Sequence, residues 1–263
     1  MSNLAENINI QEENEAEILL FPGMKTKKDG TVYKVSNNNS IDRWCDPIRD
    51  REDIKHISEY LLERIQTAKR KDTLLSAYRN RLLFIIGINV GVRVSDLVTL
   101  QWKNFFEKDM KTFVDIRNKK EKKTKKKKEV IPNECIMRGI NEYLSKVCEF
   151  GITPEYNDFI FLNSRTKNPI TDAAVEDLVK DFSKKCNLKG RYNTHSLRKT
   201  YAYQKFMNYI EHGELPAMAI AKVQKDLNHS SPLQTLEYLG ITRQERINSS
   251  IDLGEYLINS IVF

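Results

Sequence analysis

The spacing of apolar residues is the feature that most constrains the fold of this chain. From Asp46 onward these residues recur at intervals of three and four, as in Ile54, Ile57, Leu61 and Ile65. This period places them on one face of an α-helix, and the same pattern returns in most of the segments that follow. We therefore expect a mainly helical domain in which each helix buries one face.

Residues that begin and end helices divide this pattern into segments. Ser95 and Thr171 are typical N-cap residues, whereas Gly91 and Gly151 are typical of positions just past a helix end. The expected helices cover about residues 54–65, 74–90, 96–100, 134–150, 171–188, 195–210, 216–228, 232–239 and 242–248.

One part of the sequence has the period of a strand. Residues 113–117 alternate, a lysine-rich stretch follows, and an apolar segment returns at 129–132. This pattern predicts an antiparallel β-hairpin with a long basic tip. A shorter signal, a turn at Asp29-Gly30 before residues 31–35, indicates a small strand near the N-terminus. The expected fold class is mainly α with a small antiparallel β-hairpin or sheet (α+β).

The two ends of the chain differ in composition from its middle. Residues 1–42 carry an acidic cluster and a polar Ser36–Ser40 linker, with too few apolar residues for a core. They are expected to form a flexible N-terminal arm. Residues 43–263 are expected to form the main domain. Its last part, about 249–263, is too apolar to stay in water, so we expect this tail to pack on protein.

The excess of positive charge is concentrated in one place. The chain has a net charge of +7, from 43 Lys+Arg and 36 Asp+Glu. The segment Lys119–Lys128 holds eight lysines and one glutamate, so its own charge is also +7. Such a segment favours a polyanionic partner, although a solvated loop or a nuclear-localisation-like patch has the same composition.

Other classes of protein lack their sequence signals here. No apolar run approaches the roughly 20 residues of a membrane span, and the polar N-terminus is neither a signal nor a transit peptide. The histidines show no metal-ligand spacing. These features predict a cytoplasmic protein without a metal or small-molecule cofactor. Reduced, buried thiols are expected at four widely spaced positions, Cys45, Cys135, Cys148 and Cys186.

Two motifs place basic residues at helix ends. Gly91–Leu97 puts Arg93 at a helix-to-helix corner. Thr194–Thr200 puts His195 and Arg198 three residues apart, and therefore on one helix face. An arginine at a helix end often only caps carbonyl groups, so neither motif by itself indicates a function.

A third motif, Leu227–Gly240, combines a helix end, a turn and a short helix. Asn228 tolerates the left-handed conformation, His229 lies in the turn, and Pro232 suits the first position of the new helix. Tyr238 lies near the end of that helix. Taken singly, a tyrosine on an amphipathic helix is usually a half-buried core residue.

In chain order the polar residues of these motifs are Arg, His-x-x-Arg, His and Tyr. At these positions the sequence resembles the tyrosine recombinase (phage integrase) family, from about Asp46 to beyond Tyr238. The resemblance implies an integrase-type catalytic domain and a site-specific DNA recombinase. Such an enzyme cleaves and rejoins DNA strands through a 3′-phosphotyrosyl intermediate, without metal or ATP.

The resemblance also implies roles for single residues. Two guanidiniums would bind the non-bridging oxygens of a phosphodiester while the tyrosine attacks, and the histidines would accept its proton or donate to the phosphate. Asp96 would orient an arginine or a histidine. The catalytic residues implied are Arg93, Lys123, His195, Arg198, His229 and Tyr238.

The hairpin is where the family carries a lysine that protonates the leaving 5′ oxygen. Lys123-Thr124 fits this position best, and Lys122 and Lys125 remain candidates. The other lysines are expected to bind the DNA backbone. The set expected to bind DNA is Lys119, Lys120, Lys122, Lys125, Lys126, Lys127 and Lys128.

The chain departs from the family pattern in two ways. Leu227-Asn228-His229 replaces the usual Leu-Gly-His, and residues 1–42 cannot supply the N-terminal helical domain that members usually carry. The expected partner is double-stranded DNA, with assembly to a dimer or tetramer on it. The apolar tail would pack into a neighbouring protomer or on its own domain. Two alternatives are a type IB topoisomerase and a DNA-binding protein that has lost catalysis.

Overall fold

The computed structural model describes residues 24–26, 32–34 and 45–240 of the chain. By its internal contacts the chain divides into two units, Met1–Trp44 and Cys45–Phe263. In the first unit, strand β1 (Met24–Thr26) pairs antiparallel with β2 (Val32–Lys34), where the sequence indicated a small strand. The helix expected at 242–248 and the apolar tail at 249–263 lie outside the described residues.

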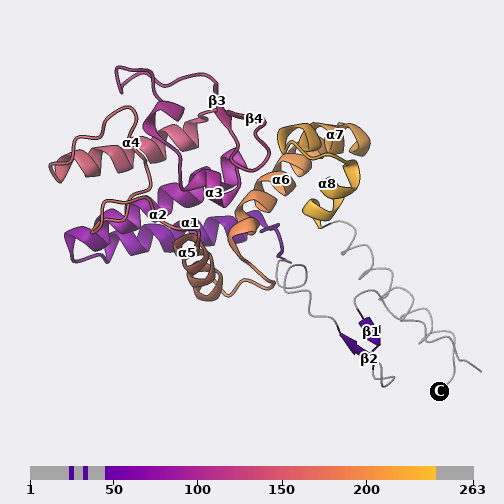
Figure 1. Ribbon diagram of the computed structural model, residues 1–263. Helices are drawn as coiled ribbons and strands as arrows, with labels where there is room; N and C mark the ends of the chain where they lie inside the picture. Colours follow the sequence, from indigo (N-terminus) through magenta and orange to yellow (C-terminus); the bar gives the residue numbers. More distant parts are fainter. Residues whose placement is uncertain (1–23, 27–31, 35–44, 241–263) are drawn as a thin grey trace, which may run out of the picture. The chain divides into compact units, whose positions relative to one another are not determined.

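The second unit is mainly helical, as predicted (Figure 1). Short strands β3 (Arg117–Lys120) and β4 (Lys127–Val130) form its hairpin, and a 3₁₀ turn covers Trp102–Asn104. Its α-helices are α1 (Arg51–Gln66), α2 (Lys71–Val90), α3 (Val94–Leu97), α4 (Glu134–Glu149), α5 (Asp172–Lys185), α6 (Thr194–Glu211), α7 (Pro216–Asp226) and α8 (Pro232–Leu239).

Most helix ends follow the local signals of the sequence. The Thr171 side chain accepts a hydrogen bond from the backbone N–H of Ala174 at the start of α5, which confirms the predicted N-cap. Gly91, Gly151 and Gly240 have φ values of 66°, 76° and 70°, so each terminates its helix in the left-handed conformation.

The start of α3 differs from the prediction. Ser95 was expected to be the N-cap, but α3 begins at Val94 and the N-cap is Arg93. The carbonyl oxygen of Arg93 accepts hydrogen bonds from the N–H groups of Asp96 and Leu97, at 2.9 and 2.8 Å. The tight corner after Gly91 therefore starts the helix earlier than a polar side chain alone would indicate.

Among the described residues, two hydrophobic clusters form the core, and α6 contributes to both. In the larger one α2 packs against α1, α4 and the start of α6, where Leu197 is buried (Figure 1). The smaller one lies between α6, α7 and α8 and contains Tyr201, Val223 and Leu239. Residues of α6 between Leu197 and Tyr201 are therefore held between two packed cores.

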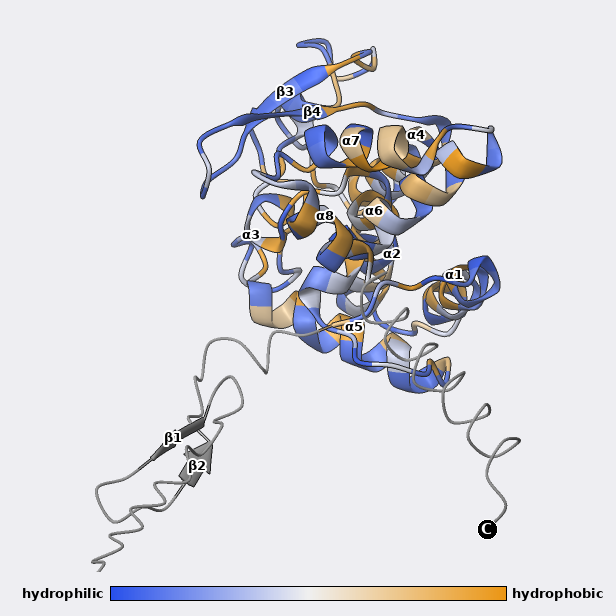
Figure 2. Ribbon diagram, turned by 90° about the vertical axis from the view of Figure 1, so that its right-hand side faces the viewer, coloured by the Kyte–Doolittle hydropathy of each residue, from blue (hydrophilic) through white to orange (hydrophobic). Residues whose placement is uncertain are grey.

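The hairpin is confirmed, but its strands lie closer to the tip than predicted. Arg117 pairs with Val130 and Lys120 with Lys127, so both strands run inside the lysine-rich segment. Phe113 forms only an isolated bridge with Phe106, because their rings pack 4.4 Å apart in the core. The strands and the tip, residues 121–126, are coloured mostly hydrophilic in Figure 2.

The four cysteines are free thiols, but only Cys45 is buried. Cys135 and Cys148 are exposed on α4 and Cys186 is partly exposed, so the expectation of burial was wrong for these three. On α4 the neighbouring residues Ile136 and Val147 face the core instead, because this helix is amphipathic and buries one face. Within the described ranges, no helix is both long and apolar enough to cross a membrane.

Gly91→Ala is expected to lower the free energy of unfolding by about 2–4 kcal/mol. The left-handed φ of this residue disfavours any side chain, and a Cβ atom here would lie 2.1 Å from Cδ1 of the buried Tyr201. Urea unfolding measures the loss. Gly151→Ala is the control, since its φ is similar and a Cβ there would meet no heavy atom within 4 Å. Equal losses at both positions would contradict the steric argument.

Candidate active site

Two arginines from different elements converge on one buried carboxylate. Arg93 comes from the α2–α3 corner, Arg198 from α6, and Glu121 from the hairpin tip. Glu121 Oε1 lies 2.8 Å from Arg93 Nη1 and 3.4 Å from Arg198 Nη1. Glu121 is 0% exposed and Arg198 is 1% exposed. The sequence-predicted arginine pair is therefore brought together, around an acid that was not predicted.

Arg198 joins the ends of two helices. Its Nη1 donates to the carbonyl oxygen of Gly91 and its Nη2 to that of Leu227, both at 2.7 Å. These carbonyl groups follow α2 and α7, and they have no partner within their own helices. Arg198 therefore caps the C-terminal ends of two helices, as a structural arginine often does. Its Nε has no partner and remains available to the site.

Both guanidiniums retain unused hydrogen-bonding capacity. Arg198 Nε is buried without a hydrogen-bond partner. Arg93 Nη1 also lacks an aligned hydrogen bond, so its contact with Glu121 is an ion pair by distance only. Buried donors of this kind are costly unless a ligand uses them. The arrangement can bind an anion with more than one acceptor oxygen.

His229 and Tyr238 lie next to each other beside the arginines. Asn228 adopts the predicted left-handed conformation, with φ of 55°, and His229 follows it in the turn before α8. The two rings meet edge to face with centroids 4.8 Å apart. His229 Nδ1 lies 3.1 Å from Oγ1 of Thr235, which is three residues before Tyr238 on the same helix. The turn and α8 therefore position both side chains together.

The environment of the Tyr238 hydroxyl has opposing effects on its acidity. Burial raises its pKa, while the charges of Arg198 and Arg93 and a hydrogen bond with Arg198 lower it. The ammonium group of Lys199 lies 5.4 Å from the centre of the ring. Any further anion-stabilising contact would favour the phenolate, the nucleophilic form.

His229 is neutral at physiological pH. It is 8% exposed, and burial together with the nearby guanidiniums of Arg198 and Arg93 lowers its pKa to about 4. A neutral imidazole has one ring nitrogen that can accept a proton. His229 can therefore act as a base toward a hydroxyl group beside it.

Replacing His229 by Gln is expected to reduce the dependence of stability on pH. The folded-state pKa of about 4 lies below the reference value of 6.5, so the unfolded state binds more protons between these values. The contribution of the neutral histidine is complete above pH 6.5 and is lost as pH falls through 4. The loss is on the order of 3 kcal/mol. Urea unfolding at about pH 7 and about pH 4.5 measures it.

The same substitution at His56, on the exposed side of α1, is the control. It removes an exposed imidazole, so an effect found only in His229→Gln reports the burial of that ring. If His229→Gln has the same pH dependence as the wild type, the burial of a neutral imidazole is not what limits stability in acid.

His195 lies in the first turn of α6, three residues before Arg198 and on the same side of the helix. Its backbone N–H donates to the side chain of Asn193, the N-cap. The histidine side chain is half-buried. The capped helix start therefore holds the His-x-x-Arg pair in one orientation.

Asp96 contacts the hairpin instead of the predicted arginine or histidine. It is fully buried, and its Oδ1 accepts a 2.9 Å hydrogen bond from the backbone N–H of Lys122. Its Oδ2 has no hydrogen-bond partner. The acid that follows Arg93 by three residues therefore attaches the hairpin tip to the site.

The lysines of the hairpin fall into two groups. Lys123, the predicted proton donor, is exposed on the tip. By contrast, Lys128 is 5% exposed and its Nζ donates to the carbonyl oxygen of Asp226 at 2.6 Å. Burial lowers the pKa of Lys128 to about 8, with a smaller contribution from Arg198. Lys119 is half-buried, donates to Thr99 O at 3.3 Å, and has a lowered pKa because of burial.

Lys128 was expected to bind DNA on the surface, and the structure instead buries it against the end of α7. The reason is the alternation of β4, in which Lys128 and Val130 face inward while their neighbours face outward. The lysines that do remain exposed are Lys120, Lys122, Lys123, Lys125, Lys126 and Lys127.

Three residues of the site were not found from the sequence. Glu121 could have been noticed as the only acid among eight lysines. Thr235 precedes Tyr238 by three residues, which places both on one helix face. Lys199 follows Arg198, and its burial against the carbonyl oxygen of Cys45, at 2.7 Å, had no local signal.

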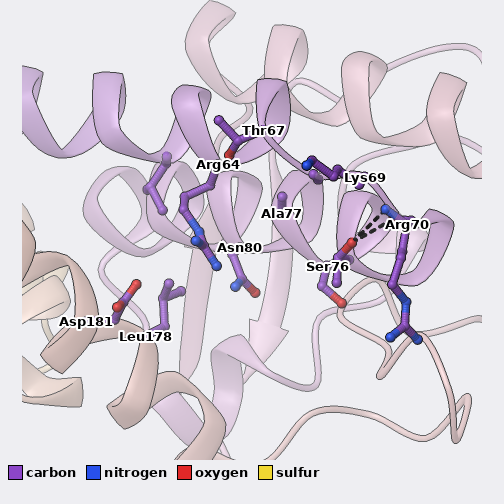
Figure 3. Close-up of a pocket in the computed structure, with 12 residues that line it drawn as sticks. Arg64, Thr67, Lys69, Arg70, Ser76, Ala77, Asn80, Leu178 and Asp181 are labelled. Atoms are coloured by element: carbon purple, nitrogen blue, oxygen red, sulfur yellow. Dashed lines mark hydrogen bonds between the residues drawn. The ribbon is translucent and has the colours of Figure 1, made fainter.

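A cavity of about 350 Å³ lies elsewhere, between α1, α2 and α5 (Figure 3). Arg64, Asn80 and Asp181 are among the residues that line it, and none of the arginine–tyrosine site does. Among the described residues, no three His, Cys, Asp or Glu side chains are grouped so as to hold a metal ion.

Comparison with known proteins identifies the family. Residues 55–245 match the model of the phage integrase family. The chain is 33% identical to the probable integrase/recombinase YoeC of Bacillus subtilis over 195 residues, which are 74% of this chain and 89% of that protein. It is 23% identical to tyrosine recombinase XerD of Staphylococcus aureus over 65% of this chain, and it spans 53% of that protein's length.

Solved structures have the same fold. The XerH site-specific recombinase, bound to its palindromic difH substrate in a post-cleavage complex, aligns with a TM-score of 0.54 and 20% identity. The alignment covers 88% of this chain and 62% of XerH. The XerA recombinase aligns with a TM-score of 0.51 and 19% identity, over 78% of this chain and 65% of XerA. Both the mainly helical fold class and the resemblance inferred from the sequence are confirmed. The chain belongs to the phage integrase family, the tyrosine recombinases.

Proposed function

We propose that this protein is a site-specific DNA recombinase in which Tyr238 attacks a phosphodiester held by Arg93 and Arg198. The observation that supports this most strongly is the convergence of both guanidiniums on a single buried carboxylate, next to Tyr238, whose pKa the charges of Arg198 and Arg93 lower against the effect of burial. Two guanidiniums can bind the phosphate and stabilise the charge that develops during attack, and the Tyr238 hydroxyl lies beside them as the nucleophile.

The reaction forms a bond between Tyr238 Oη and phosphorus and breaks the bond from phosphorus to the 5′ oxygen. The tyrosine proton passes to His229, which is neutral, or to His195, and the leaving 5′ oxygen takes a proton from a lysine of the hairpin. Because the phosphotyrosyl ester keeps the energy of the broken bond, a 5′ hydroxyl from another strand reseals the DNA by the reverse steps. Exchange of strands between the two steps is recombination.

The named relatives favour recombination over the topoisomerase alternative, since YoeC and XerD both carry recombinase in their names. The gathered arginine, histidine and tyrosine side chains also weigh against a protein that has lost catalysis. The substrate is double-stranded DNA in the cytoplasm, on which the protein assembles as a dimer or tetramer. Residues 43–263 act as the catalytic unit and residues 1–42 as an arm.

Suicide substrates test this function. These DNA duplexes carry a nick next to the cleavage site, so that the 5′ fragment diffuses away and the covalent complex accumulates. We expect a protein–DNA adduct on a subset of sequences, in complexes larger than one protomer. Absence of adducts from a substrate library that spans the host DNA would contradict the proposal. Cleavage of every sequence alike would favour the topoisomerase.

One lysine of the hairpin is expected to protonate the leaving 5′ oxygen, and Lys123 is the residue we propose. Replacing that oxygen by sulfur makes protonation unnecessary, because a thiol has a pKa near 8.5 and leaves as the thiolate. An alanine scan of Lys119–Lys128 on oxygen and sulfur substrates should find one variant that cleaves only the sulfur substrate. The scan also tests the buried Lys128. If no lysine shows this rescue, the proton comes from His195 or water.

A further inference from the structure

We propose that Glu121 occupies the phosphate position in the DNA-free protein, so that the scissile phosphate must displace it and thereby release the hairpin tip. This inference rests on the proposed function, because it assumes that Arg93 and Arg198 bind the phosphate. Glu121 is then an internal competitor of DNA and a latch on the tip.

The position of the carboxylate supports this assignment. Glu121 Oε1 lies within 2.8 and 3.4 Å of the two guanidiniums, and its Oε2 accepts a hydrogen bond from the hydroxyl group of Thr124. Burial alone would raise its pKa, but Thr124, Arg93 and Arg198 together hold the pKa below its usual value. The group is therefore an anion between two arginines, which is the chemistry of the expected ligand.

Two anions cannot share this position. A phosphodiester between the same guanidiniums would lie in contact with the carboxylate, and like charges in contact in a buried site repel each other strongly. Two further titratable groups among the described residues interact with Glu121. His229 is neutral at pH 7, and the Nζ of Lys128 donates to the carbonyl oxygen of Asp226. Neither separates the two anions, so Glu121 must leave when the phosphate binds.

A phosphate also satisfies the arginines better than the carboxylate does. One Glu121 oxygen is used by Thr124, which leaves a single oxygen for two guanidiniums. Arg198 Nε and Arg93 Nη1 remain without hydrogen bonds. A phosphodiester offers two non-bridging oxygens, each able to accept from a forked donor. When the phosphate displaces Glu121, both arginines therefore gain hydrogen bonds that the carboxylate does not provide.

Release of Glu121 frees the hairpin tip, because the same residue closes it. The Glu121 N–H donates to Lys126 O at 2.9 Å, and the Lys125 N–H donates to Glu121 O at 3.1 Å. The next residue, Lys122, is held through its N–H by Asp96. When the carboxylate leaves the arginines, this turn loses its strongest attachment. The exposed Lys123 can then move toward the site that Glu121 vacates.

Glu121→Gln tests the proposal, with Glu129→Gln as the matched control. Glu129 is an exposed acid on β4 of the same hairpin, so both substitutions raise the net charge by one. Both are made in a Tyr238→Phe background, so that binding is measured without cleavage. We expect Glu121→Gln to bind the cleavage-site duplex at least about tenfold more tightly than Glu129→Gln at the same salt concentration.

Hydrogen exchange on the DNA-free protein is the second measurement. The tip amides at residues 121–126 are expected to exchange faster in Glu121→Gln than in Glu129→Gln. Sulfate, a dianion with several acceptor oxygens that can compete for the arginines, should accelerate exchange of these amides in the wild type, compared with chloride at equal ionic strength. Thr124→Val keeps the carboxylate but removes the hydroxyl group that donates to it, so its tip amides should exchange at an intermediate rate. This variant replaces Glu121→Gln in the test if Glu121→Gln folds poorly.

The proposal is overturned if Glu121→Gln binds DNA no more tightly than Glu129→Gln, or if sulfate leaves tip exchange unchanged. Neither measurement requires cleavage. If the wild type forms no adduct on suicide DNA but sulfate still releases the tip, the recombinase function fails while the latch stands. If adducts form and the tip does not respond, the latch alone fails.

Discussion

Tyr238→Phe is expected to abolish the covalent protein–DNA complex while leaving DNA binding nearly unchanged. The substitution removes only the oxygen that would bond to phosphorus. The ring that packs edge to face on His229 at 4.8 Å remains, so α8 keeps its position. Trapping on suicide DNA measures the adduct, and a shift assay measures binding. We expect no adduct above background in the variant.

Tyr201→Phe is the control for this experiment. Its hydroxyl group donates to Asp226 at 3.1 Å in the smaller core, and burial raises its pKa strongly, so it is a poor nucleophile. It should still form adducts once corrected for the fraction of folded protein. A mass-spectrometric adduct on Tyr201, Tyr203 or any tyrosine other than Tyr238 would contradict the assignment.

Arg93→Lys and Arg198→Lys are each expected to slow strand cleavage by about 10²–10³-fold, although the charge is kept. A lysine cannot donate to two phosphate oxygens from a planar fork. The two variants should differ in stability. Arg198→Lys also loses at least one of the 2.7 Å hydrogen bonds to Gly91 O and Leu227 O, which costs about 1–3 kcal/mol. Arg93→Lys removes neither of these hydrogen bonds and keeps a charge next to Glu121.

Single-turnover cleavage and urea unfolding, measured on the same preparations, separate these effects. Arg79→Lys is the control, because Arg79 is partly buried and donates to Leu162 O at 3.0 Å, away from the site. It should lose stability and keep cleavage per folded molecule. Near-normal cleavage by Arg93→Lys or Arg198→Lys would mean that this arginine belongs only to the scaffold.

Helix ends were predictable because the interactions that set them act within a few residues. The Thr171 side chain reaches only to the N–H of Ala174, and Asn228 and Gly240 adopt left-handed conformations that their own chemistry permits. On α1 the apolar spacing likewise predicted the buried residues Ile57, Leu61 and Ile65. The order of arginine, histidine and tyrosine was enough to state a resemblance, which the family match confirmed.

Predictions failed where a contact between distant segments decides the outcome. Packing of Phe113 on Phe106 moves the start of β3 to Arg117, and the alternation of β4 takes Lys128 out of solvent. Neither outcome can be inferred from composition, because a lysine-rich run is indistinguishable from a solvated loop until its register against the core is known.

The arginine site shows the same division. The sequence by itself determined the helix that carries Arg198 and the corner after α2 that carries Arg93, since apolar periodicity and the glycine at the end of α2 are local signals. Only the tertiary structure decided that Glu121, 77 positions before Arg198, lies between the two arginines. A glutamate among lysines is expected to remain in water. The free energy of removing its charge from water exceeds the attraction that neighbouring residues in the sequence can provide. The guanidiniums of Arg93 and Arg198 make burial of the Glu121 carboxylate favourable, because they pair with its charge. Packing around α6 sets the positions of both groups.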